Sequence, residues 1–478
     1  MGHPADAARN FHRLTMHDPA WRQPGDPRLV RGFRPMQPQR RPPQFKTYPG
    51  IEITPLPRDV TLGESLDVGA LGGLLFLSAG VTRVKEVAGR PMYFRAAGSA
   101  GNLAPVELYV VTGDLDGLGA GVYHYQPLEH GLVRLRGAPS DVPTALVLTG
   151  VPWRTAWKYG ERGFRHCYWD AGTMLAHTLA VAGASGRDAR LELAFVDAEV
   201  TAVIGADGTH EFPLTIVGLD GSPSLPPPVD VPSGHVADDP LEFPLITETQ
   251  RAGDLRETAD VADWRRSAAA LAAPPAPPAG DWAPPGPLPE LIRRRGSTRR
   301  FDPASVAPAG LLTDALAWAT RPVPGDFLPA GATLLEHHLA VHAVGDVPAG
   351  VYRWGSGGLE QVREGDVRAT ARHLCLGQDL GGDGCYTAFH CADDRVTEAL
   401  GSRGYRAAQL QAGIVGGRLH LAAFALGFGA SGLTFFDDDV RRAFGTDAWP
   451  LLVTAVGAPA YRSKPGGLPG QPARLSPA

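Results

Sequence analysis

The chain has 478 residues and a formal net charge of −5, with 45 lysine and arginine residues against 50 aspartate and glutamate residues. This length favours two or three domains. The slightly acidic balance argues against a general nucleic-acid-binding protein, which needs a basic face. The N-terminal residues MGHPADAARN lack an apolar signal core, and the apolar run at 69–81 is too short to span a bilayer. We therefore expect a cytoplasmic protein with no nucleic-acid or membrane partner.

The predicted elements mix strands and helices along the whole chain. Residues 105–111 (PVELYVV) are rich in β-branched and aromatic side chains and predict a strand. Residues 168–184 and 409–427 are apolar with interspersed small residues and predict two buried helices. Residues 432–438 (GLTFFDD) predict a strand whose closing carboxylates cap the next helix. The sequence thus indicates an α+β fold.

The sequence also repeats itself. RGFRHCYWDAG at 162–172 and RGYRAAQLQAG at 403–413 share arginine, alanine and glycine positions at an interval of 241 residues. Upstream, GVYHY at 121–125 matches GVYRW at 350–354. Because the matches keep the same order, they indicate a duplication into two tandem domains.

The proline-rich stretches mark a connection between the two repeats. LPPPVDVP and APPAPPAGDWAPPGPLP exclude helix and central strand and favour a stiff, extended chain. Residues 246–272 have helical periodicity, so we expect the connection to pack on the body of the protein. We divide the chain into an N-terminal lead-in at 1–50, a first domain at 51–221, a proline-rich linker at 222–288, a second domain at 289–464 and a tail at 465–478.

The cysteines and histidines show no metal-binding pattern, so no metal ion is expected. We expect the four cysteines to be buried thiols in a reducing compartment and three histidines to be packing or surface residues. These residues are Cys167, Cys375, Cys385 and Cys391, and His337, His338 and His420.

The stretch RRRGSTRRF at 293–301 concentrates five arginines in nine residues of an acidic chain. One interpretation is a solvated surface patch, which composition alone favours. The other is a binding site for an anion, since arginine makes charge-assisted and often bidentate hydrogen bonds to phosphate.

The order of the motifs favours the second interpretation. RGSTRRF (295–301) resembles the Arg-x-Ser-x-Arg signature of the flavin-dependent nitroreductase fold. RAAGSAGNLAPVELYVV (95–111) and KYGERGFRHCYWDAG (158–172) resemble segments of the SagB-type azoline dehydrogenases of ribosomal peptide pathways. FKTYPG (45–50) resembles the lead-in of that branch. The resemblance implies two nitroreductase-like domains that form an intramolecular pseudo-dimer, as a monomer or within a higher homo-oligomer, with FMN between them.

Under this resemblance each half contributes a different part of one FMN site. The second half keeps the phosphate-binding signature, which is missing from the corresponding segment of the first half, 61–73. The first half keeps the serine-containing turn, which is missing from the corresponding segment of the second half, 328–333. We expect one FMN per chain. The residues concerned are Arg295, Ser297 and Arg299 from the second half and Ser99, Ala100, Gly101 and Asn102 from the first.

Further residues are assigned to the same site. Arg462 or Lys464 supplies the basic residue that the family places near its C-terminal end. Gly432 and Leu433 lie in GASGLTFF, whose flexible backbone suits either the flavin ring or tight helix–strand packing. Gly98 departs from the family pattern, which has proline at that position.

Lys158 and Tyr159 are the expected catalytic residues. Aromatising an azoline removes a hydride and a proton, and the proton needs a base. Neither side chain is a good base at neutral pH unless its pKa is lowered. Burial lowers the pKa of a lysine and a nearby cation lowers that of a tyrosine, so we expect Arg162 and Arg165 to tune the pair.

The predicted function is FMN-dependent oxidation of thiazoline or oxazoline rings in a ribosomally made precursor peptide, with a cyclodehydratase as partner. One alternative is an NAD(P)H-dependent nitro- or quinone reductase. Another is a non-catalytic flavin-fold scaffold that binds peptides or partner enzymes.

Overall fold

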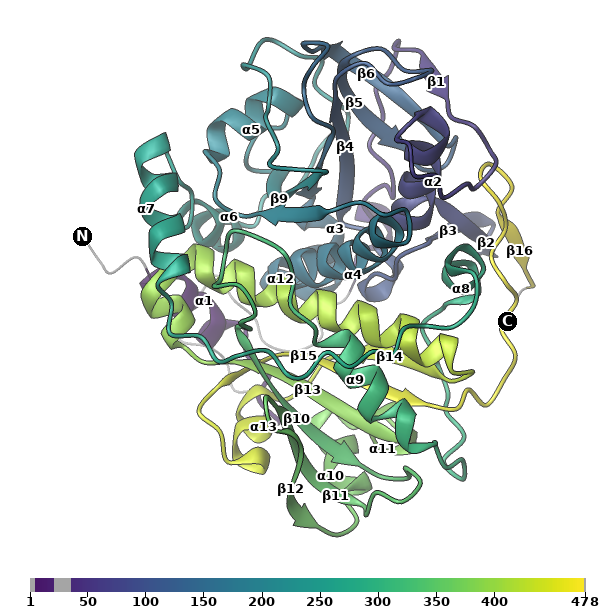
Figure 1. Cartoon of the computed structure of the whole chain (residues 1–478), viewed down its shortest axis with the longest axis vertical. Coiled ribbons are helices and arrows are strands. Elements are labelled where there is room, and N and C mark those ends of the chain that lie inside the picture. The colour runs from purple at the N-terminus through teal and green to yellow at the C-terminus, as the bar shows by residue number, and fades with distance from the viewer. Residues whose placement is uncertain (1–4, 21–35, 477–478) are drawn as a thin grey trace.

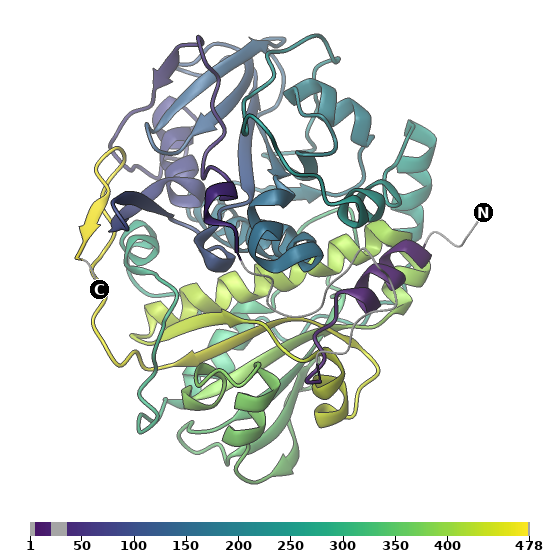
Figure 2. The same ribbon diagram turned by 180° about the vertical axis from the view of Figure 1, so that it is seen from behind.

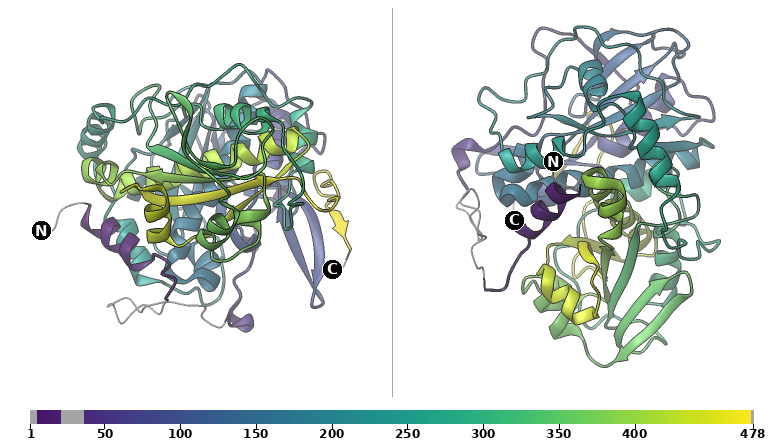
Figure 3. Two further views of the ribbon diagram at one scale, coloured as in Figure 1. Left: turned by 90° about the horizontal axis from the view of Figure 1, so that it is seen from below. Right: turned by 90° about the vertical axis from the view of Figure 1, so that its left-hand side faces the viewer.

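The computed structural model describes residues 5–20 and 36–476. Figure 1 shows the first half of the chain above and the second half below, each built around its own sheet. The helices α4 (Gly163–Ala184) and α12 (Arg395–Ala425) lie between them. Figures 2 and 3 show the same layers from behind and from the side. Of the lead-in expected at 1–50, residues 1–4 and 21–35 lie outside the described residues.

The sheet of the first half has the strand order β1–β6–β5–β4–β7–β9–β8 within the described residues. Alternate side chains of β4 enter two different cores: Leu108 and Val110 face one, and Tyr109 and Val111 face the other. β4 confirms the strand expected at 105–111. The strands are β1 (Ile53–Pro55), β4 (Val106–Thr112), β5 (Gly121–Gln126), β6 (Gly131–Gly137), β7 (Ala145–Gly150), β8 (Ala189–Glu192) and β9 (Phe212–Leu219), and the helices around them are α2 (Val68–Ala79), α3 (Pro152–Tyr159) and α5 (Asp197–Ile204).

The sheet of the second half has the order β12–β11–β10–β13–β15–β14 within the described residues. Each of these strands corresponds to the strand at the same place along the first half of the chain: β12, β11, β10, β13, β15 and β14 match β6, β5, β4, β7, β9 and β8. This agrees with the predicted repeat. The strands are β10 (Leu335–Val341), β11 (Gly350–Gly355), β12 (Gly358–Glu364), β13 (Tyr386–Ala392), β14 (Gly429–Leu433) and β15 (Trp449–Gly457), and the helices are α9 (Thr313–Ala319), α10 (Arg368–Leu374), α11 (Leu380–Asp383) and α13 (Asp437–Phe444).

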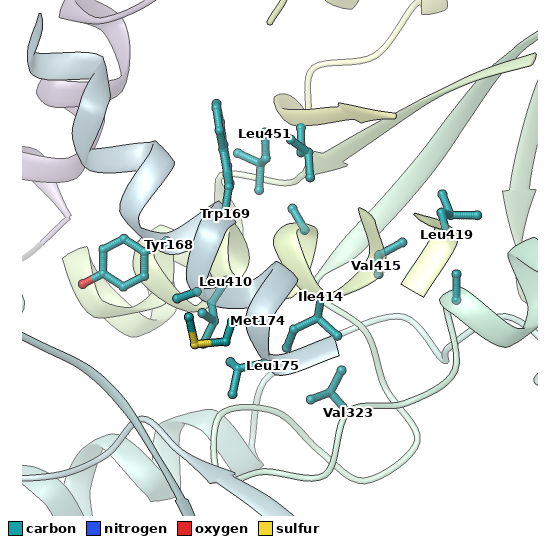
Figure 4. Close-up of a cluster of buried hydrophobic side chains, with 14 of the residues drawn as sticks. Tyr168, Trp169, Met174, Leu175, Val323, Leu410, Ile414, Val415, Leu419 and Leu451 are labelled. Carbon is teal, nitrogen blue, oxygen red and sulfur yellow. The ribbon is translucent and has the colours of Figure 1, made fainter. Parts of the chain in front are cut away.

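Helices α4 and α12 pack directly against each other and confirm the two buried helices expected from the sequence. A Cβ atom on Gly172 would lie 2.4 Å from the Leu410 carbonyl oxygen, and one on Gly413 would lie 2.4 Å from the Trp169 carbonyl oxygen. Glycine at both positions therefore lets the two backbones approach. Figure 4 shows the apolar side chains beside this contact, among them Trp169, Met174 and Leu175 from α4 and Leu410, Ile414 and Val415 from α12.

An aspartate of the second half forms ion pairs with two arginines of the first half. Asp437 is fully buried, and its carboxylate lies 3.0 Å from an Arg162 nitrogen and 2.9 Å from an Arg165 nitrogen. Burial raises the pKa of Asp437, but the two arginines outweigh that effect and lower it. The expected helix cap is therefore wrong for this residue: Asp437 begins α13 but makes no side-chain cap, because its oxygens are taken by the arginines.

The same kind of ion pair occurs with the roles of the two halves exchanged. Asp197 of the first half lies 2.6 Å from an Arg403 nitrogen and 3.5 Å from an Arg406 nitrogen of the second half. These residues occupy the repeat positions of Asp437, Arg162 and Arg165. Each half thus buries its own arginine pair against an aspartate of the other.

The expected linker packs on the body of the protein, as predicted. It forms α6 (Pro244–Arg251) and α7 (Thr258–Ala269), which divide the helical region expected at 246–272. The indole of Trp264 donates a hydrogen bond to the Leu400 carbonyl, and the Thr333 N–H donates one to the Pro274 carbonyl. These contacts fix the connection to the second half.

The two ends of the chain also join the halves. Helix α1 (Asp6–Leu14) contacts α12, visible in Figure 2. Strand β16 (Ala473–Leu475), in the expected tail, pairs with β2 (Val81–Val87) of the first half, and β2 pairs with β3 (Arg90–Arg95). No helix in the described part of the chain has the length and apolar content needed to cross a membrane.

Candidate functional site

Arg295 is a buried cation with a free hydrogen-bond donor. It follows α8 (Leu288–Arg294) and is 3% exposed. Its Nε and Nη2 atoms donate to the Ala96 carbonyl of the first half, while Nη1 has no partner among the described residues. Burial, and then the charge of Arg83, lower the pKa of Arg295 to about 9, so the guanidinium stays charged at neutral pH. An unpaired buried charge is costly, and the site therefore favours an anionic ligand.

The strand β14 lies beside the residues that follow Arg295. Ser297 forms a parallel bridge with Ala430, and the Thr298 N–H donates to the Ala430 carbonyl. The two interpretations of GASGLTFF, contact with the flavin and tight packing, apply to different glycines. A Cβ on Gly429 would lie 2.1 Å from Thr298 Oγ1, so Gly429 serves packing, whereas nothing lies within 4 Å of a Cβ on Gly432.

The turn at Ser99–Asn102 of the first half reaches this region. A Cβ on Gly98 would lie 3.2 Å from Arg295 Nη1 and 3.6 Å from Ser297 Oγ. Ser99 Oγ accepts a hydrogen bond from the Ala104 N–H, so it also stabilises its own turn. The structure thus brings together motifs that lie about two hundred residues apart in the sequence: the serine turn of one half and the arginine signature of the other.

Lys158 and Tyr159 lie against the same turn, at the end of α3. A Cβ on Gly101 would lie 2.9 Å from the Tyr159 hydroxyl oxygen and 3.3 Å from Lys158 Nζ. The Tyr159 ring stacks on His166 of α4 with 4.2 Å between ring centroids. The two expected catalytic residues and the expected cofactor residues therefore share one region of the molecule.

The electrostatics of Tyr159 differ from the sequence expectation. Burial, and then the charge of Asp170, raise its pKa above the ordinary value. The arginines expected to lower it, Arg162 and Arg165, are paired with Asp437 instead. That part of the prediction is wrong, because the sequence did not show that the arginines are committed across the halves.

The remaining basic residues lie toward the surface. Arg299, Arg462 and Lys464 are exposed. The Arg299 N–H donates to the Tyr461 hydroxyl, so the segment that contains Arg462 runs beside the arginine signature. Lys464 Nζ donates to the Arg474 carbonyl. Among the described residues no side-chain hydrogen bond holds Arg299 or Arg462, whereas Lys464 would have to leave the Arg474 carbonyl to reach an anion near Arg295.

Two residues of this region were missed by the sequence analysis. Arg83 is buried and its guanidinium donates to the carbonyls of Lys464 and Arg293, tying both basic segments to β2. Asp170 accepts hydrogen bonds from the Ala100 N–H. No motif marks Arg83, but the repeat alignment places Asp170 opposite Gln411 and would have drawn attention to it.

The corresponding loop of the second half, residues 320–334, is held by contacts from the first half and from the linker. Asp326 accepts hydrogen bonds from the N–H groups of Leu193 and Ala194 and pairs at 3.1 Å with Arg265 of α7. The linker helix therefore contacts the loop that is the repeat counterpart of the Ser99–Asn102 turn.

Histidines and cysteines lie in the core. His337, His338 and His420 are buried, which confirms packing, not surface, positions. All four cysteines are buried and free. No group of three or more potential metal ligands occurs among the residues that the structure describes.

Residues 292–458 match the model of the nitroreductase family. A protein of Methanocaldococcus jannaschii assigned as a nitroreductase, MJ1384, is 27% identical over 167 residues, which cover 32% of this chain and 79% of that protein. A crystal structure from Anabaena variabilis, also assigned as a nitroreductase, superposes with a TM-score of 0.75 at 24% identity, covering 95% of this chain and 99% of that one. The chain has the nitroreductase fold. The predicted α+β, nitroreductase-like fold is thereby confirmed, while the division into two tandem domains that form a pseudo-dimer stays a prediction.

Proposed function

We propose that the chain binds one FMN between its halves and uses it as an oxidoreductase. The observation that carries this proposal is the buried, charged Arg295 with its free Nη1, held by the Ala96 carbonyl of the opposite half. Ser297 and the exposed basic residues Arg299, Arg462 and Lys464 would add contacts to the phosphate. The rest of the FMN molecule would lie against the open backbone at Gly432, the buried Leu433 and the Ser99–Asn102 turn.

We further propose that the substrate is a thiazoline or oxazoline ring in a ribosomally made peptide. Converting the azoline to the azole breaks two C–H bonds and forms one C=C bond. One hydrogen leaves as a hydride and the other as a proton. When bound, FMN supplies the acceptor for the hydride, and oxygen or another acceptor later removes the electrons.

The pair beside Gly101 would handle the proton. Because the pKa of Tyr159 is raised, its hydroxyl stays protonated at neutral pH and orients the ring as a hydrogen-bond donor. Lys158 is exposed, so the burial that was expected to tune it is absent. Its amine also lies beside the turn and is the proposed proton acceptor in its neutral form. A precursor peptide and the cyclodehydratase that makes its rings are the proposed partners, in the cytoplasm.

A second candidate is an NAD(P)H-dependent nitro- or quinone reductase; the relatives' names, which say nitroreductase, agree with the nitro-reducing part of it. The two functions differ in the direction of electron flow. NADH would bleach the flavin absorbance of a reductase but not that of a dehydrogenase that receives its electrons from the peptide.

The test uses the full chain loaded with FMN and a synthetic peptide that carries one azoline ring. We expect the peptide to lose the mass of two hydrogens, with bleaching of the flavin under anaerobic conditions. A matched peptide with the ring already aromatic is the control. An unchanged azoline peptide, together with rapid bleaching by NADH, would favour the reductase.

A further inference from the structure

The segments around the candidate phosphate site carry more positive charge than FMN can neutralise. Residues 289–301 and 459–476 together hold eight basic residues and one acidic residue, Glu290. The phosphate of FMN carries about two negative charges near neutral pH, and the buried Arg295 is already assigned to it. FMN therefore accounts for only part of this positive charge.

A buried arginine holds the two basic segments together. Arg83 of β2 donates from its guanidinium to the carbonyls of Arg293 and Lys464, at 2.7 and 2.9 Å. Strand β16 pairs with β2 beside it, and the Lys464 amine donates to the Arg474 carbonyl at 3.1 Å. Figures 1 and 2 show the C-terminal tail running past α8 to β2 along one edge of the molecule. The two segments therefore form one continuous surface.

Backbone contacts extend this surface past the arginine signature. Phe301 and Pro459 form an antiparallel bridge, and the Ala460 N–H donates to the Arg300 carbonyl. We call the result the basic surface. Its exposed cations are Arg294, Arg299, Arg300, Arg462, Lys464 and Arg474. None of these cations forms an ion pair within the described part of the chain, so the surface offers its full charge to an anionic partner.

Apolar side chains lie among these cations. Tyr461 is 38% exposed and Leu468 is 42% exposed. A free phosphate would gain nothing from these two side chains, whereas a polypeptide with acidic and apolar residues would contact both them and the cations. Outside the two basic segments, acidic residues outnumber basic ones. This distribution disfavours a long nucleic acid, which would extend over the acidic remainder of the molecule.

We propose that the basic surface binds an acidic, partly apolar segment of the peptide substrate and holds it beside the flavin site. Arg294 and Arg299 stand on either side of Arg295 and Ser297 in the sequence, so the docked segment lies next to the candidate site. The inference rests on the proposed function in taking the polypeptide to be the substrate. The docking itself requires neither FMN nor an azoline ring.

The experiment measures binding to the full chain by fluorescence anisotropy, with and without FMN. The probe is a fluorescein-labelled synthetic peptide of repeated Glu-Asp-Leu-Gly units. The control peptide carries glutamine and asparagine in place of the acidic residues. We expect the neutral peptide to bind at least about tenfold more weakly than the acidic one. In about 1 M salt, where the Debye length is about 3 Å, this difference should disappear.

A pair of substitutions locates the binding on the basic surface. The double variant Arg294→Gln and Arg474→Gln spares the residues proposed to contact the FMN phosphate. Its Kd for the acidic peptide should rise about fivefold, while its Kd for FMN stays within about twofold of the wild type. The matched control is Arg353→Gln with Arg363→Gln, since these arginines of β11 and β12 are also exposed and have no ion pair among the described residues. The control should bind the peptide as the wild type does.

Equal Kd values of the two double variants for the acidic peptide would overturn the inference, and so would equal binding of the acidic and neutral peptides. A single-stranded DNA of the same charge that binds more tightly than the acidic peptide, and does so through Arg294 and Arg474, would assign the surface to nucleic acid and also overturn it. Either result leaves FMN binding intact. Peptide binding by a chain that takes up no FMN would support the docking surface and contradict the proposed flavin function.

Discussion

Gly172 and Gly413 meet where the two halves of the chain cross: a Cβ atom on Gly413 would lie 3.0 Å from the Gly172 Cα. These two glycines occupy the same position in the repeated sequence. The contact therefore joins the halves at equivalent points, as a symmetric dimer interface would.

Replacing Gly172 with alanine should destabilise the protein, because the new methyl group would meet the backbone of α12. Overpacking of this kind costs about 1–3 kcal/mol, measured as the free energy of unfolding in denaturant. Gly183→Ala is the matched control, since Gly183 lies in the same helix with nothing within 4 Å of its Cβ. Equal effects of the two substitutions would contradict the close approach at Gly172.

Asp437→Asn should destabilise the fold at neutral pH by about 3 kcal/mol, because it leaves Arg162 and Arg165 buried without a counter-charge. The folded pKa of Asp437 is lowered, so its contribution is present above the unfolded value of about 3.9 and is lost as the pH falls through the folded pKa. The difference between wild type and variant should therefore shrink in acid.

Urea unfolding at several pH values measures this difference. Asp438→Asn is the control, because Asp438 is the neighbouring carboxylate and is half exposed. A destabilisation by Asp437→Asn that does not depend on pH would show that the ion pairs across the halves contribute little.

The sequence predicted the buried helices and the strand β4, because hydrophobic pattern reports on these features directly. The convergence of two distant motifs was predicted from the resemblance to the nitroreductase fold. The sequence did not predict the partners of Arg162 and Arg165, since an arginine in a motif gives no sign of which distant carboxylate it will meet. It also misassigned Asp437, whose place at a helix start is typical of a cap. Its true partners come from the other half, and pairing of this kind depends on tertiary packing.

Arg295→Ala should weaken FMN binding by about 10- to 100-fold, since a hydrogen bond to a charged group contributes about 1.5–3 kcal/mol. Arg294→Ala is the matched control, because the adjacent arginine is exposed. Arg295→Lys tests the charge and the shape of the side chain separately. Lysine keeps the positive charge but lacks the planar guanidinium that donates two hydrogen bonds to the Ala96 carbonyl. Equal Kd values for the alanine variants would contradict a role for buried Arg295.

Tyr159→Phe and Lys158→Met should retain FMN but lose azoline turnover by about a hundredfold or more, the usual contribution of a positioned proton-transfer group. Single-turnover flavin bleaching with the azoline peptide measures this loss. Tyr352→Phe is a control, since the Tyr352 hydroxyl bonds to the Pro348 carbonyl in the second sheet. Turnover within twofold of the wild type, a margin of about 0.4 kcal/mol, would contradict the assigned roles.

The central claim is that two unequal halves build one flavin site, with Arg295 on one side and the Ser99–Asn102 turn on the other. Titration of the apo-protein with FMN, followed by calorimetry, tests it most directly. The account predicts saturation at one FMN per chain, because the segment of the first half that corresponds to the arginine signature, residues 61–73, has no arginine. Saturation at two FMN per chain, or binding that Arg295→Ala leaves unchanged, would contradict it.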